Sequence, residues 1–104
     1  MGNKKIYIAG FDVFMPLEYA KLRGQAMKRV CNLYGFEGLY PLDNESTNSK
    51  DIFEGNIKLI DKCDYIVANL NPFRGKEMDC GTAFELGYGK AKGKILLGYR
   101  DWET

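Results

Sequence analysis

A short apolar segment in the second half of the chain constrains the fold more than any other feature. Tyr65-Ile66-Val67-Ala68-Asn69-Leu70 is a nearly continuous apolar run, and its length suits a strand. A strand with one face in water alternates apolar and polar residues, whereas a strand of a parallel sheet is covered on both faces. The segment therefore predicts a parallel sheet with helices on both sides.

Further strands alternate with helices along the chain. Strands are expected at residues 5–9, 36–42, 65–70 and from 95 onward, and helices at about 16–33, 50–62 and 81–92. This order predicts an α/β fold with right-handed crossovers, in which residues 1–104 form one domain with a sheet of about four strands. If the strand order is flavodoxin-like, the chain reverses direction between the first and third strands. Ligands then bind beyond the carboxyl ends of those two strands.

Two apolar surfaces are expected to be buried. The inner face of the first helix should include Leu17 and Val30, and the strand at 95–97 should be covered on both sides. That strand would lie at a sheet edge, where exposed apolar residues invite association. We therefore expect either a partner subunit or additional C-terminal elements to cover it.

Composition excludes several classes of function. Fifteen basic residues nearly balance fourteen acidic ones without long runs of either sign, which argues against a nucleic-acid groove. The sequence shows no signal-peptide pattern and no apolar stretch long enough to cross a membrane, and Cys31, Cys63 and Cys80 form no C-x-x-C pair. We read the three cysteines as reduced thiols of a cytoplasmic protein. Histidine is absent, which excludes Ser-His-Asp and Cys-His catalysis and the common zinc ligand sets.

The run from Asp79 to Tyr88 is the strongest candidate for a functional site. It places two carboxylates, Asp79 and Glu85, six positions apart between the best strand and a helix. Such a pair can break a glycosidic bond through a covalent sugar intermediate. Glu85 has a structural alternative, because Thr82-Ala83-Phe84-Glu85 fits a helix-capping box, and Asp79 has one as a helix cap. In both interpretations Glu85 is expected to be ionised near the helix start.

Other candidates lie on segments that the topology brings to the same crevice. Tyr7 stands near the carboxyl end of the first strand, where its hydroxyl can point at Glu85, although a tyrosine is an ordinary strand residue. Asn56 lies in helical register with apolar residues, so its amide is expected to face inward and to need hydrogen-bond partners. The remaining candidates for substrate contact come from loops and a helix start: Gly10, Phe11, Phe14, Asp43, Asn44 and Gly81. Packing for the aromatic residues and a turn role for Asp43 and Asn44 are the structural alternatives.

Together these residues resemble the nucleoside 2-deoxyribosyltransferase family over nearly the whole chain. The resemblance includes the segments 6–10, 41–45, 52–57 and 71–75, and its most specific block is Asp79-Cys80-Gly81-Thr82-Ala83-Phe84-Glu85-Leu86-Gly87. It implies a flavodoxin-like three-layer α/β/α fold that is short at the C-terminus relative to the family. Asn56 stands where some members carry an aspartate.

The resemblance also implies a retaining transfer of a 2-deoxyribosyl group between nucleobases. Glu85 matches the family nucleophile, Tyr7 the tyrosine beside it, and Asp79 the acidic residue that protonates the base. The expected partners are deoxynucleosides, nucleobases and further copies of the chain, with no metal, cofactor, nucleic acid or membrane. The alternatives are an N-glycosidase of nucleosides or deoxynucleoside 5′-monophosphates, which would transfer the sugar to water, and a non-catalytic nucleoside-binding protein.

Overall fold

Strands and helices alternate along the chain, as the apolar patterning predicts. The computed structural model describes residues 4–41, 49–73 and 76–100. Its elements are β1 (Lys4–Ala9), the 3₁₀ turn η1 (Phe11–Phe14), α1 (Leu17–Leu33), β2 (Phe36–Leu39), α2 (Ser49–Lys62), β3 (Tyr65–Asn69), α3 (Cys80–Ala91) and β4 (Ile95–Tyr99). The predicted strands and helices are confirmed with small shifts at their ends, and η1 is an addition.

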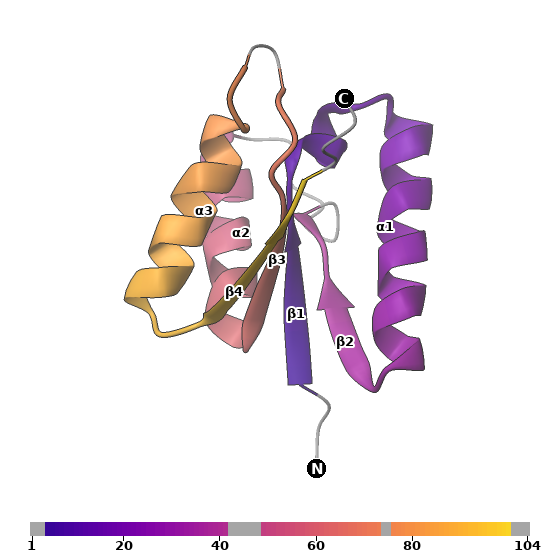
Figure 1. Ribbon diagram of the computed structural model, residues 1–104, viewed down its shortest axis with the longest axis vertical. Helices are drawn as coiled ribbons and strands as arrows, with labels where there is room; N and C mark the ends of the chain where they lie inside the picture. Colours follow the sequence, from indigo (N-terminus) through magenta and orange to yellow (C-terminus); the bar gives the residue numbers. More distant parts are fainter. Residues whose placement is uncertain (1–3, 42–48, 74–75, 101–104) are drawn as a thin grey trace.

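The described strands form one parallel sheet in the order β2-β1-β3-β4. In Figure 1 the sheet runs through the middle of the molecule, with α1 on one side and with α2 and α3 on the other. The predicted three-layer α/β/α fold is therefore confirmed. The strand order reverses between β1 and β3, which are parallel neighbours. The segments that follow these two strands therefore start side by side at the carboxyl ends of the sheet strands.

The main core lies between the sheet and the pair α2 and α3. Its buried members are Tyr7, Ala9, Leu39, Ile60, Cys63, Ile66 and Ala68. Gly89 allows α3 to approach β3 closely, because a Cβ at this position would overlap the Ile66 side chain. Tyr7 and Ile66 are paired across β1 and β3, so they share this face of the sheet. The core thus fixes α3 against the strand that carries Tyr7.

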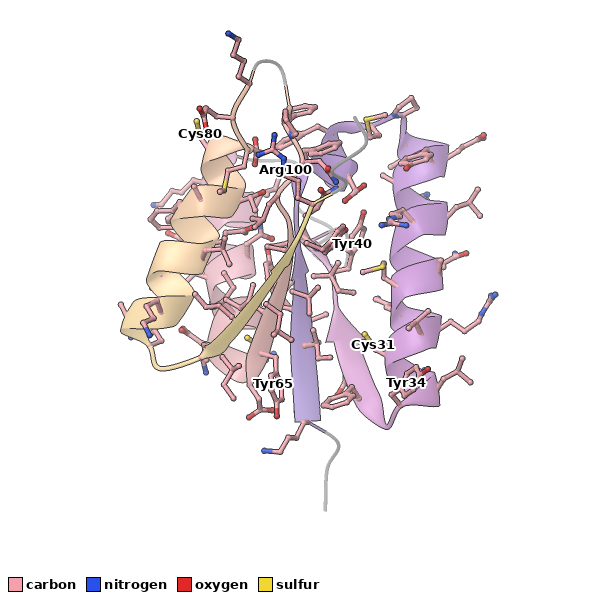
Figure 2. All side chains as sticks on the ribbon, in the orientation of Figure 1. Cys31, Tyr34, Tyr40, Tyr65, Cys80 and Arg100 are labelled. Atoms are coloured by element: carbon pink, nitrogen blue, oxygen red, sulfur yellow. The ribbon has the colours of Figure 1, made fainter. Side chains whose placement is uncertain are left out.

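The other face of the sheet is covered less completely. Close to β2 the contact is tight, because a Cβ on Gly24 of α1 would lie 2.6 Å from the Tyr40 ring, which Figure 2 shows between α1 and the sheet. Farther away, Ile95 and Leu97 of β4 are 54% and 53% exposed. In the single chain no described helix covers these two side chains, so the expectation that a partner subunit or further C-terminal elements cover this strand stays a prediction.

The inner face predicted for α1 needs correction. Leu17 and Val30 are 59% and 52% exposed, whereas Ala20 is buried and Met27 and Cys31 are partly buried. The helix follows the β2 side of the sheet, so its apolar stripe is wider than the surface it covers.

Two further expectations concern cysteines and membranes. Cys31, Cys63 and Cys80 are free thiols in the structure. Among the described residues, no helix combines the length and the apolarity needed to cross a bilayer. The assignment of residues 1–104 to a single domain stays a prediction, as does association between copies of the chain.

Candidate active site

The start of α3 is capped by Asp79 and not by Glu85. The Asp79 carboxylate oxygen Oδ2 accepts hydrogen bonds from the Thr82 backbone N–H at 2.9 Å and from the Thr82 hydroxyl at 3.1 Å. The donor that a capping box would offer to Glu85 is therefore already taken. The helix begins at Cys80, so Glu85 lies beyond its first turn and its carboxylate is available for another contact.

Glu85 instead reaches across to β1. The Tyr7 hydroxyl donates a hydrogen bond of 2.6 Å to Glu85 Oε2, and Tyr7 is completely buried. This distance lies within the range of charge-assisted O–H to carboxylate bonds. Burial and the neighbouring Glu85 carboxylate raise the pKa of Tyr7, so the phenol keeps its proton and acts as a donor.

The environment of Glu85 shifts its protonation. Burial raises the pKa of Glu85 from 4.5 to about 7, the Tyr7 hydrogen bond opposes this rise, and the nearby Asp79 carboxylate adds to it. The expectation of a fully ionised carboxylate at neutral pH is therefore wrong. The dipole of a helix stabilises a negative charge only within the first turn, and Glu85 lies beyond that turn.

A cavity of about 430 Å³ opens next to this carboxylate. It is bounded by the residues that follow β1 and β2, by one face of α2 and by the start of α3. The lining residues are Gly10, Phe14, Pro41, Ile52, Phe53, Asn56, Ile57, Asp79, Gly81, Phe84 and Glu85. The described lining contains two carboxylates and one amide in mainly apolar walls, and no basic residue. Such a site suits a small, flat and largely uncharged ligand.

The structure brings most of the predicted site residues together. Gly10, Phe14, Asn56, Asp79, Gly81 and Glu85 line the cavity, and Tyr7 contacts it through its bond to Glu85. Phe11 does not, because its ring stacks on Phe73 with centroids 4.7 Å apart and faces a second cavity. The expected contact between Phe11 and substrate is corrected accordingly. Asp43 and Asn44 lie outside the described residues.

Asn56 has an acceptor without a partner. Its Oδ1 is buried and makes no hydrogen bond to any described residue. A buried amide oxygen without a partner is unfavourable by about 1–3 kcal/mol. The side chain lines the cavity, so a bound ligand can satisfy this acceptor.

The apolar walls of the cavity were not identified from the sequence. Phe53 of α2 and Phe84 of α3 contact each other at 5.4 Å between ring centroids, and both are about half exposed. Phe53 and Ile60 are both apolar residues of α2, but only Ile60 is buried. In the sequence, the only indication of an apolar wall next to the carboxylate was Phe84, which directly precedes Glu85.

The fold and the cavity define a small parallel α/β protein with a carboxylate-lined cavity at the carboxyl ends of its strands. The chain belongs to the nucleoside 2-deoxyribosyltransferase family, whose sequence model matches residues 6–104. A solved 2-desoxiribosyltransferase from Leishmania mexicana is 44% identical and superimposes with a TM-score of 0.86. The alignment covers 93% of this chain and 64% of that one.

More distant relatives extend this picture. An uncharacterized Schizosaccharomyces pombe protein, C191.05c, is 36% identical over 104 residues, which cover 90% of this chain and 48% of that protein. The chain thus spans about half the length of this relative. A 2-deoxyribosyltransferase from Bacillus psychrosaccharolyticus has a TM-score of 0.70 at 23% identity, with 92% of this chain and 72% of that chain covered. The CMP N-glycosidase BcmB of Clostridium botulinum has a TM-score of 0.66 at 22% identity, with 93% and 69% covered. At these two identities the likeness shows the fold alone.

Proposed function

We propose that this protein transfers 2-deoxyribosyl groups between nucleobases with Glu85 as the nucleophile. The observation that carries the proposal is the 2.6 Å hydrogen bond from the buried Tyr7 hydroxyl to Glu85, a carboxylate on the wall of a ligand-sized cavity. The bond uses Oε2, which leaves Oε1 to attack. Family membership supplies the substrate class, deoxynucleosides and free nucleobases.

In the first step Glu85 Oε1 attacks C1′ of the deoxyribose from the face opposite the base. A C–O bond forms, the C1′–N bond breaks, and its electron pair leaves with the base. Asp79, together with water, delivers the proton that the base takes up. Because Asp79 caps α3 through Oδ2, its Oδ1 is the oxygen available for this role.

In the second step another base attacks C1′ from the vacated side, the C1′–O bond to Glu85 breaks, and the N–H proton of the incoming base returns to Asp79 and water. Two inversions at one carbon retain the configuration, which requires one nucleophilic carboxylate. Phe14 and the pair Phe53 and Phe84 supply flat apolar surfaces for the bases. This scheme uses no metal or cofactor.

The protonation of Glu85 sets a pH limit on this reaction. Only the ionised carboxylate attacks C1′, and burial raises its pKa to about 7 in the free protein. We therefore expect kcat/KM to rise tenfold for each pH unit below about 7 and to level off above it.

The decisive test is mass spectrometry after mixing the protein with a deoxynucleoside. A mass increase of one deoxyribosyl group that maps to the peptide containing Glu85 is expected, and its absence together with ligand binding would indicate a non-catalytic binding protein. Glu85→Ala should lose both the adduct and base exchange. Glu54→Gln is the matched control, because Glu54 is an exposed carboxylate of α2 that does not line the cavity. Appreciable transfer by Glu85→Ala rejects the assignment.

Hydrolysis is the second candidate, because water can enter the cavity from outside. Glu85 is only partly buried, and Phe14 and Phe53 at the same cavity are 56% and 52% exposed, so water can reach the site. Water would then attack the sugar ester in place of a second base. Incubation with and without an acceptor base separates the two reactions, since equal release of deoxyribose in both cases indicates hydrolysis.

A further inference from the structure

Two segments that line the candidate site leave the sheet side by side. The turn η1 follows β1 and supplies Phe14, while the loop at 70–79 follows β3 and supplies Asp79. β1 and β3 are neighbours in the sheet, and both segments lie at its upper end in Figure 1. The relative placement of Phe14 and Asp79 therefore depends on what joins the two segments.

The joining residue is Asn69, the last residue of β3. Its Nδ2 donates to Asp12 Oδ2 of η1 at 3.2 Å. Its Oδ1 accepts from the Asn71 backbone N–H at 3.0 Å and from Asn71 Nδ2 at 2.7 Å. Asn69 and Asp12 are 4% and 7% exposed, so the contact is protected and lost bonds would be unfavourable. One amide thus uses its donor toward η1 and its acceptor toward the loop.

Two other contacts depend on the same arrangement. Gly10 lines the cavity and packs against Asn69 so closely that an added Cβ would lie 2.8 Å from the Asn69 Cβ. Phe73 of the loop stacks on Phe11 and on Phe14 of η1, with ring centroids 4.7 and 5.8 Å apart. A shift of Asn69 would therefore move the cavity wall as well as the loop.

We propose that Asn69 is a positioning residue for the reaction. It holds the Phe14 wall and the Asp79 loop in one arrangement around the bound base. This inference rests on the proposed function for its effect on turnover, but the contact itself can be tested without turnover. A positioning role requires a donor toward residue 12 and an acceptor toward residue 71, and among side chains of this size only asparagine provides both.

The ionisable groups around Asp12 allow the need for a donor at position 69 to be tested by varying the pH. Four ionisable groups on neighbouring elements face Asp12: Arg23, Tyr19, Tyr40 and Tyr99. Arg23 Nε lies 3.8 Å from Asp12 Oδ1, and burial raises the pKa of Tyr40 to about 12. A second cavity of about 530 Å³ exposes this region to solvent, so protons can exchange there. In the neutral pH range a carboxylate placed at position 69 would therefore respond chiefly to Asp12.

The test exchanges the donor and the acceptor between positions 12 and 69. Asn69→Asp places two carboxylates together, which repel unless they share a proton. We expect its kcat/KM relative to the unaltered protein to fall by roughly tenfold to a hundredfold at pH 8 and to recover as the pH is lowered. The double variant Asp12→Asn/Asn69→Asp restores one donor and one acceptor, so it should recover to within about threefold. Asp12→Asn alone keeps an acceptor for Asn69 and should stay within about threefold, because it loses only the 3.8 Å contact with Arg23, whose side chain is 37% exposed.

Amide hydrogen exchange at Asn71 and Phe73 and thermal unfolding are measured alongside turnover at each pH. Faster exchange at these two amides in Asn69→Asp, reversed in the double variant, supports the inference. A loss of activity that is equal at every pH, or a double variant no better than Asn69→Asp, overturns it. If the unaltered protein turns over no deoxynucleoside, the proposed function fails separately. Hydrogen exchange then decides, and unchanged exchange in Asn69→Asp overturns the positioning role.

Discussion

Replacing Glu85 with glutamine is expected to stabilise the folded protein at alkaline pH. Burial raises the pKa of Glu85 from 4.5 to about 7. Between these two values the folded state holds more protons than the unfolded state, so stability decreases as the pH rises through this interval. At about 1.36 kcal/mol for each pKa unit, the decrease amounts to up to about 3 kcal/mol by pH 8. Glutamine is neutral at every pH, and its carbonyl oxygen can still accept the Tyr7 hydrogen bond.

Urea unfolding, followed by circular dichroism from pH 4.5 to pH 8.5, measures this effect. The difference between the free energies of unfolding of Glu85→Gln and the unaltered protein removes contributions of other titrating groups. It should be close to zero at pH 4.5, increase in favour of the variant toward pH 7, and remain constant above pH 8. Glu54→Gln serves as the control for loss of a carboxylate at an exposed position.

A pH-independent difference between the two proteins would refute this reasoning. It would mean that Glu85 titrates at the same pH in the folded and unfolded states, and that burial does not disfavour its charge. The predicted acid limit on turnover would then move from about pH 7 toward pH 4.5.

Three further substitutions probe the site. Tyr7→Phe removes the donor that opposes the raised pKa of Glu85, so the acid limb of kcat/KM should move to higher pH and the plateau should fall by roughly tenfold to a hundredfold; an unchanged pH–rate profile would contradict this. Asn56→Asp adds a carboxylate to the same cavity and should also move the acid limb upward, which a pH titration of turnover or of Glu85 itself can test. Gly10→Ala should destabilise the fold by about 1–3 kcal/mol, because Gly10 has a φ of +152° and the new Cβ would meet Asn69; urea unfolding that shows no loss would reject the backbone argument.

Much of the fold could be predicted because burial follows the period of the apolar residues. The run at 65–70 implied a sheet covered on both faces, and β3 lies between β1 and β4 with helices on both sides. The turn η1 has only four residues, which is too short for a hydrophobic period to show. The exposure of Ile95 and Leu97 fits the expected apolar sheet edge, but periodicity predicts only which side chains share a face and not what covers that face.

Some residues of the candidate site could be predicted from the sequence and others could not. Glu85 could be singled out because a carboxylate between two apolar residues near a helix start needs a reason. Phe53 could not, because an aromatic residue on the apolar side of a helix has the same pattern whether it fills a core or lines a cavity. Phe11 and Phe14 occupy the same turn, and only its three-dimensional course directs Phe14 to this cavity and Phe11 to the second one.

The hydrogen bond between Tyr7 and Glu85 joins β1 to α3, whereas part of the apolar cavity wall lies on another helix. Tyr7 belongs to β1 and Glu85 to α3, whereas Ile52 and Phe53 belong to α2. Under the proposed function, these two α2 residues can therefore be exchanged to alter which base is accepted while the bond between Tyr7 and Glu85 is kept. Directed evolution of substrate range should begin with that helix.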